Sequence, residues 1–130
     1  MVDALKRQVG GSHYTDMKYQ PMELCEDLML YPAFVHVTKY LTRNKGDRKI
    51  NLEKALHCIV IEYEYLTEQH ELPKVEKISF MDEEYLKSFC GQFENASQYF
   101  NILNALLSKD YAKTIVLMQN LLQSPTWEQI

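Results

Sequence analysis

The feature that most constrains the fold of this chain is a run of apolar residues at helical spacing between residues 51 and 68. Its members are Leu52, Ala55, Leu56, Ile59, Tyr63 and Leu66. Residues three or four apart share one face of an α-helix, so this run predicts a long helix. Asn51 is suited to be its N-cap residue, and Glu53 is favourably placed in the first turn.

The far side of the same predicted helix also carries apolar residues, namely Cys58, Ile61 and Tyr65. A helix that is apolar on two sides lies either at the centre of a fold or in a contact between subunits. We therefore expect the chain to form a homo-oligomer.

The remainder of the 130 residues predicts further helices and a single fold. Residues 1–20 form an irregular arm that contains Gly10 and Gly11. Helices are expected over 21–30, 32–43, 51–68, from 82, from 95 and over 111–124, with a polar linker at 69–79. The predicted fold is all-α, a small helical bundle with an irregular, glycine-containing N-terminal arm. We assign residues 1–70 to a helical core. Residues 71–130 form a helical hairpin or triplet that packs on this core or at an oligomer interface.

Several protein classes are disfavoured by the composition. No apolar run reaches the length of about eighteen residues that a membrane span needs. The first residues lack the apolar stretch of a secretory signal, so we expect a cytoplasmic location. Cys25, Cys58 and Cys90 are far apart and form no Cys-x-x-Cys element, so we expect ordinary buried thiols and no metal site.

The charge of the chain is unevenly distributed. The net charge is −4, yet residues 39–54 carry six basic and two acidic side chains, a net charge of +4. This contrast favours a local anion-binding site over general affinity for nucleic acid. A solvated basic loop without a ligand is the alternative.

A short glycine element near the N-terminus adds possible anion donors. It consists of Gly10, Gly11, Ser12, His13 and Tyr14. Two glycines allow consecutive backbone N–H groups to converge on an anion, and the hydroxyls add donors. His13 is the candidate proton acceptor, although a plain turn with an exposed histidine is the alternative. No Walker A loop occurs in the chain.

The predicted helix over 32–43 has two distinct faces. Phe34, Val37, Thr38 and Leu41 share one face, and His36, Lys39, Tyr40 and Arg43 share the other. Arginine and lysine both bind phosphate, and Tyr40 could stack on a base. Lys45 follows in the connection. Lys54 and His57 lie one turn apart on the next helix and could face the same cleft, although a core position for His57 is the alternative.

Four segments occur in the order found in a known phage family. They are Gly-Gly-Ser-His-Tyr at 10–14, Gln20-Pro21, Lys-Tyr-Leu-Thr-Arg at 39–43, and Asn-Leu-Glu-Lys-Ala at 51–55. Over residues 8–70 the chain resembles the family of unknown function DUF3310, also called SaV-like. The positions that match are Ser12, His13, Tyr14, Gln20, Pro21, Lys39, Tyr40, Arg43, Leu52, Lys54 and Ala55. The chain departs from the family at Asn51, where aspartate is common, and at His57-Cys58, where aromatic residues are common.

The resemblance implies a bacteriophage protein made early in infection, located in the cytoplasm of the infected bacterial host. The family includes a podophage nucleotide kinase that phosphorylates deoxynucleoside monophosphates without a P-loop. It also includes the lactococcal phage protein SaV, which confers sensitivity to a host abortive-infection system. If the missing aspartate at position 51 were the acid–base group, activity in this chain would be in doubt.

Three hypotheses follow. The favoured one is a non-enzymatic effector that binds a host defence protein or nucleic acid and has a phosphate- or nucleotide-binding pocket. Its ligand-binding residues would be Gly11, Ser12, His13, Tyr14, Gln20, Lys39, Tyr40, Arg43, Lys45 and Lys54. The alternative is a deoxynucleoside monophosphate kinase with His13 as base, for which a nucleotide is the only expected cofactor. A MazG-like nucleotide pyrophosphohydrolase is less favoured. Glu23 and Glu26 have the spacing that lets two carboxylates share a magnesium ion, but the matching Glu-x-x-Asp on a later helix is missing and only Glu62 is available there.

Overall fold

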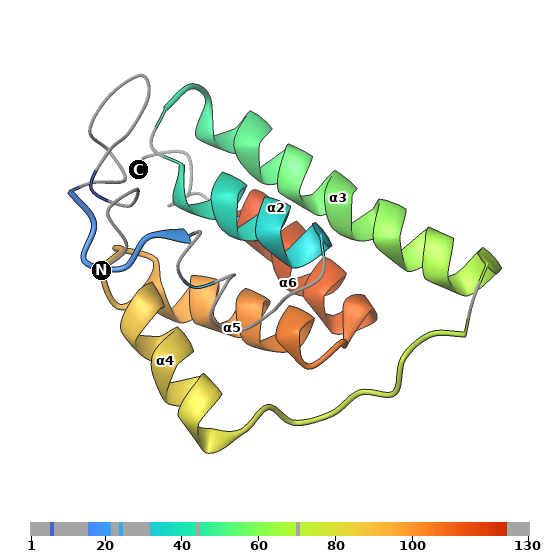
Figure 1. Cartoon of the computed structure of the whole chain (residues 1–130). Helices are drawn as coiled ribbons and strands as arrows, with labels where there is room; N and C mark the ends of the chain where they lie inside the picture. The colour runs from blue at the N-terminus through green and yellow to red at the C-terminus, as the bar shows by residue number, and fades with distance from the viewer. Residues whose placement is uncertain are drawn as a thin grey trace.

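The computed structural model describes residues 6, 16–21, 24, 32–43, 45–69 and 71–124. It places five helices along this part of the chain (Figure 1). These are α2 (Pro32–Thr42), α3 (Arg48–Gln69), α4 (Phe80–Cys90), α5 (Ala96–Leu107) and α6 (Tyr111–Leu122). No strand occurs among the described residues. The all-α fold class predicted from the sequence is confirmed.

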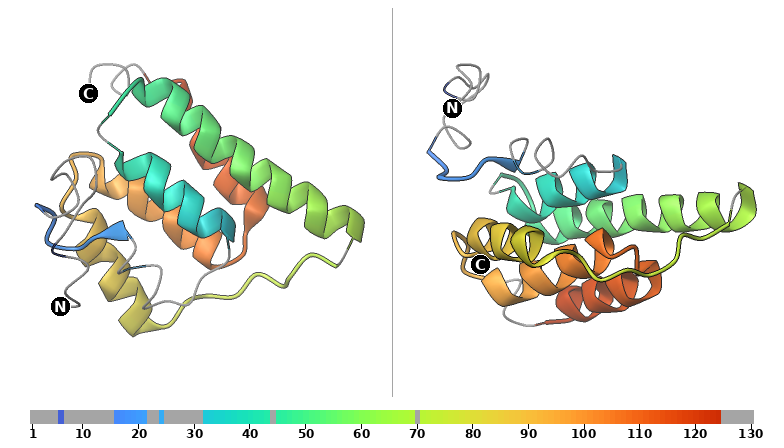
Figure 2. Two further views of the ribbon diagram at one scale, coloured as in Figure 1. Left: turned by 45° about the horizontal axis from the view of Figure 1, so that its top comes forward. Right: turned by 60° about the horizontal axis from the view of Figure 1, so that its bottom comes forward.

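Four of the helices form a closed ring. Helix α2 packs on α3, α3 on α6, α6 on α5, and α5 on α2, while α4 packs on α5. Figure 1 and the left view of Figure 2 show α3 along one outer edge of this bundle, with its C-terminal turns extending past the neighbouring helices. Residues 71–79 run without helix from the region after α3 towards α4, as the polar sequence predicts.

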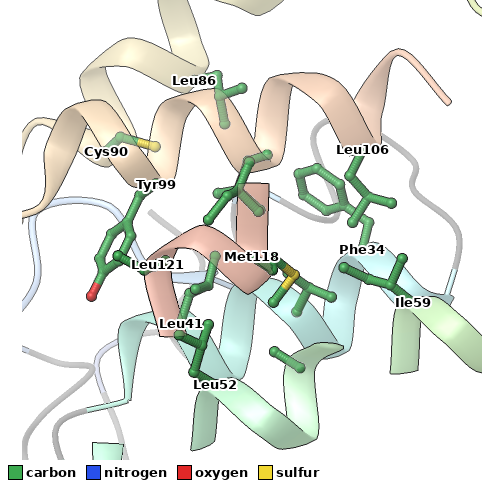
Figure 3. Close-up of a cluster of buried hydrophobic side chains, with 14 of the residues drawn as sticks. Phe34, Leu41, Leu52, Ile59, Leu86, Cys90, Tyr99, Leu106, Met118 and Leu121 are labelled. Carbon is green, nitrogen blue, oxygen red and sulfur yellow. The ribbon is translucent and has the colours of Figure 1, made fainter. Parts of the chain in front are cut away.

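One hydrophobic core joins the two halves of the chain. Leu41 of α2 and Leu52 of α3 belong to the same buried cluster as Met118 and Leu121 of α6. Figure 3 shows Leu41 and Leu52 close to Leu121. The described part of 71–130 therefore packs directly on the helices of 1–70.

The two faces expected for the helix over 32–43 are confirmed in α2. Phe34, Val37, Thr38 and Leu41 are all buried. His36 and Lys39 are exposed, whereas Tyr40 and Arg43 are half-buried. Helical periodicity was sufficient to distinguish the two faces, because the residues that are buried on folding recur on the side of the helix that packs against α3 and α5.

The predicted start of the long helix is wrong by one turn. Helix α3 begins at Arg48, and the Asp47 carboxylate accepts hydrogen bonds from the backbone N–H groups of Lys49 (2.9 Å) and Ile50 (3.2 Å). Asp47 therefore caps the helix. Asn51 is buried at 6% exposure, and its side chain donates to the carbonyl oxygen of Lys45 (2.8 Å). The Asn51 side chain holds the preceding loop against α3 and does not cap the helix.

Replacing Asp47 with alanine is expected to lower the free energy of unfolding by about 1 kcal/mol, because two N–H groups of the first turn lose their acceptor. Urea denaturation followed by circular dichroism measures the change. Asp16→Ala is the control, since Asp16 is exposed and precedes the helices. A change at Asp47 no larger than at Asp16 would contradict the capping role.

Helices α5 and α6 begin where the sequence predicts, whereas α4 begins two residues early. The Ser79 hydroxyl accepts from the Asp82 N–H (3.1 Å), so α4 begins at Phe80, slightly before the predicted acidic run. The Asp110 carboxylate accepts from the Lys113 N–H (3.1 Å) and caps α6. Asn95 directly precedes α5 and its residue type is suited to a cap, but the interpretation of Asn95 as the capping residue is wrong, because its side chain makes no capping hydrogen bond.

Candidate anion-binding site

Two lysines of the basic stretch come together on the side of α2 and α3 that faces solvent. Lys39 of α2 and Lys54 of α3 each place the ammonium group 5.9 Å from the ring centre of Tyr40. The two lysines are fifteen positions apart in the sequence and are joined only by the packing of α2 on α3. We call Lys39, Tyr40 and Lys54 the cationic site.

The electrostatics of the cationic site favour an anion. Both lysines are exposed, and Tyr40, which like Lys39 belongs to α2, is half-buried. The negative face of an aromatic ring attracts ammonium groups at this distance, so the ring gathers the two charges on one surface. Two gathered ammonium groups present up to six N–H donors, which is the kind of group that holds a phosphate oxygen.

The loop after α2 adds two further cations in the sequence. Arg43 follows the end of α2 and is half-buried, and Lys45 is exposed. The bond from Asn51 to the Lys45 carbonyl holds this loop against α3. Gly46 has φ +73°, a left-handed conformation that favours glycine and turns the chain back into α3.

Arg48 belongs to the same basic stretch but has a different role. Its guanidinium donates to the hydroxyl of Tyr99 in α5 (2.8 Å) and links the start of α3 to the second half of the chain. Burial raises the pKa of Tyr99, and the positive charge of Arg48 opposes that rise. The net charge of the stretch therefore overstates the charge that faces a ligand.

The two histidines of this region are exposed. His36 lies on α2 and His57 on α3, one turn after Lys54. The alternative in which His57 occupies the core is therefore wrong. His57 lies on the same side of α3 as Lys54, as the spacing of three residues predicts.

The glycine element and some other predicted residues lie outside the described part of the chain. These are Gly10, Gly11, Ser12, His13, Tyr14, Glu23, Cys25 and Glu26. Convergence of His13 with Lys39 and Arg43 therefore stays a prediction. Gln20 is described and is only 7% exposed. Beside it, the Gln92 amide donates to the Tyr19 carbonyl oxygen (2.8 Å) and accepts from the Tyr19 N–H (3.4 Å), which ties this segment to the turn after α4.

A second feature of this side is an apolar groove between α2 and α3. It measures about 380 Å³ and is lined by Pro32, Ala33, His36, Cys58, Ile61, Glu62 and Tyr65. Glu62 is the one carboxylate in this lining, and its oxygens accept from the backbone N–H of Ala33 and the hydroxyl of Tyr111 (3.3 Å). Burial raises the pKa of Glu62, and these two hydrogen bonds oppose the rise.

Glu62 was considered in the sequence only as a metal ligand, and its structural role was missed. It accepts from an N–H in the first turn of α2, a turn that has no acidic residue of its own. The signal in the sequence was a carboxylate at the flank of an otherwise apolar helix face. Among the described residues, no group of histidine, cysteine, aspartate and glutamate side chains could hold a metal ion.

The two described cysteines are free thiols, and the expected burial is confirmed for Cys90 but not for Cys58. Cys58 is half-buried at the groove, and Cys90 is in the core. Burial raises the pKa of both, and that of Cys90 reaches about 12.

None of the helices in the described ranges combines the length and the apolar character that crossing a membrane requires. Comparison with family models, with curated proteins and with solved structures gives no match.

Proposed function

We propose that this chain is a non-enzymatic phage effector whose cationic site binds a phosphate group of a nucleotide or of nucleic acid. The observation that carries the proposal is the approach of Lys39 and Lys54, from two helices, to the single ring of Tyr40. The resemblance of residues 8–70 to the SaV-like family supports the effector role. The local excess of basic residues in an acidic chain supports the phosphate.

The chemistry of the cationic site supports binding more directly than catalysis. Lysine ammonium groups hold charge, and a tyrosine ring offers a surface on which a base can stack. Phosphoryl transfer would need an acceptor for the proton of the attacking hydroxyl, the role given to His13 from the sequence. The kinase alternative therefore depends on a residue outside the described ranges, whereas binding depends on residues that the structure brings together.

Titration of the full chain with a set of phosphate compounds tests the proposal. The set is inorganic phosphate, dGMP, ATP and a labelled single-stranded oligonucleotide, followed by calorimetry or fluorescence polarisation. Lys39→Ala combined with Lys54→Ala is expected to weaken binding by about fivefold, since two partly screened contacts of this kind contribute about 1 kcal/mol together. The salt dependence of oligonucleotide binding should also become shallower.

Lys113→Ala is the matched control, because Lys113 is an exposed lysine on α6 and the substitution is the same. It should leave the affinity unchanged. Equal affinity of the double variant and the parent chain for every compound would refute the cationic site. Transfer of phosphate from ATP to dGMP or dTMP by the pure chain would replace the effector proposal by the kinase alternative.

A further inference from the structure

We infer that two copies of this chain pair through the outward face of α3, with the helices antiparallel and a two-fold axis near Ile61. This inference goes beyond the phosphate-binding proposal and shares only Lys54 with the cationic site. The outward face consists of Ile50, Lys54, His57, Ile61, Glu64, Tyr65 and Glu68, all of which are exposed. At 100° per residue they lie together, opposite the buried residues Leu52, Ala55 and Ile59.

The middle of this face is apolar although it is exposed. Ile61 has 54% of its surface exposed and Tyr65 has 56%. They border the apolar groove, which continues onto Pro32 and Ala33 of α2. Helix α3 packs on α2 and α6 with its other sides, and its C-terminal turns extend beyond both (Figures 1 and 2). A contiguous exposed patch of this kind is typical of an interaction surface.

The charges along α3 specify a second copy as the occupant. On the outward face, the first half of the helix carries the basic Lys54 and no acidic side chain. The second half of the same face carries Glu64 and Glu68 and no basic side chain. An antiparallel copy places the basic half of each helix beside the acidic half of the other. The surface is therefore complementary to itself, as a two-fold symmetric interface requires.

The position of the axis follows from the same pattern. An axis at Ile61 places it against the partner's Ile61 and places His57 against the partner's Tyr65. Lys54 then lies opposite the partner's Glu68 at each end. This arrangement has an apolar centre and a charged rim, the usual organisation of a protein interface. In the dimer, the partner copy covers the apolar groove along the side that Ile61 and Tyr65 form.

The main test is the molar mass of the full chain between about 1 and 100 μM, the range in which modest interfaces associate. Sedimentation velocity should show twice the monomer mass of 15.4 kDa at the upper end. Ile61→Asp places two like charges at the axis and should weaken pairing by at least about tenfold. Val116→Asp is the matched control, because Val116 is a β-branched residue on α6 with the same 54% exposure. It should pair like the parent chain.

A charge exchange tests the antiparallel register. Lys54→Glu and Glu68→Lys should each weaken self-association, because each brings like charges together at both ends. An equimolar mixture of the two variants should associate again, because both opposite-charge pairs are restored in the mixed dimer. Association of the mixture cannot be explained by a difference in stability, because the mixture is compared with each of the same two variants alone.

The two proposals share Lys54 and are separated by residues that belong to one only. Ile61→Asp should weaken pairing and keep phosphate affinity, whereas Lys39→Ala should weaken phosphate affinity and keep pairing. A monomer at every concentration, a dimer that withstands Ile61→Asp, or a variant mixture that stays monomeric would each overturn the inferred dimer. None of these outcomes would affect the phosphate-binding proposal.

Discussion

Replacing Leu52 with alanine is expected to lower the free energy of unfolding by about 3 kcal/mol, within the range of about 2–5 kcal/mol for such core truncations. Leu52 has no exposed surface and lies in the cluster that joins α2 and α3 to α5 and α6. The substitution removes buried apolar surface and leaves a cavity that a ring of packed helices can fill only partly. The melting temperature should fall by roughly 10 °C for a chain of this size.

The distribution of this loss also tests whether the two halves form one cooperative unit. Backbone hydrogen exchange at Ile59 in α3 and at Ile102 in α5 should accelerate by the same factor, since both residues belong to one buried cluster. Leu72→Ala is the matched control, because Leu72 is 39% exposed in the linker after α3. It should cost less than about 0.5 kcal/mol. Faster exchange confined to α3 would show that 71–124 folds separately.

The second large effect is expected at Glu62. Glu62→Ala should lower the free energy of unfolding by about 2 kcal/mol, because the Tyr111 hydroxyl and the Ala33 N–H lose their shared acceptor. Tyr111 is only 5% exposed, so water cannot readily replace the carboxylate there. Glu64→Ala on the same helix is the control, since Glu64 is exposed. Chemical denaturation at neutral pH, with both variants dilute, measures the difference.

The pH dependence of Glu62→Gln tests the same contact in a second way. Burial raises the pKa of Glu62 in the folded chain above its ordinary value of 4.5. The folded state therefore binds the proton more tightly than the unfolded state does. The resulting stabilisation is complete below pH 4.5 and is lost as the pH rises through the folded pKa. Glutamine keeps an acceptor but cannot titrate. The free energy of unfolding of Glu62→Gln relative to that of the parent chain should therefore increase from pH 4 to pH 7. A constant difference would contradict the raised pKa.

The candidate site could be predicted from the sequence only in part. Lys39, Tyr40, Arg43 and Lys54 were chosen from charge and helical spacing, and two of these lysines do meet at Tyr40. The different role of Arg48 could not be predicted, because Tyr99 lies 51 positions away and is brought near only by packing. The same holds for Glu62, whose partners Ala33 and Tyr111 lie on two other helices.

The sequence by itself determined where the helices lie and which of their faces are buried. Local spacing carries that information, because every third or fourth residue of a helix shares one side and apolar residues on that side must leave water. Thus the buried faces containing Phe34 and Leu52 could be predicted without any knowledge of their neighbours.

Only the tertiary structure decided which helices meet and which polar groups pair. The start of α3 shows the reason on a small scale, since Asp47 and Asn51 are both good capping residues. In the folded chain, the Asp47 carboxylate caps the helix by accepting from the Lys49 N–H, and the Asn51 amide donates to the Lys45 carbonyl oxygen. Pairings of this kind depend on distances across the fold. The number of residues that separate two positions in the sequence does not indicate those distances.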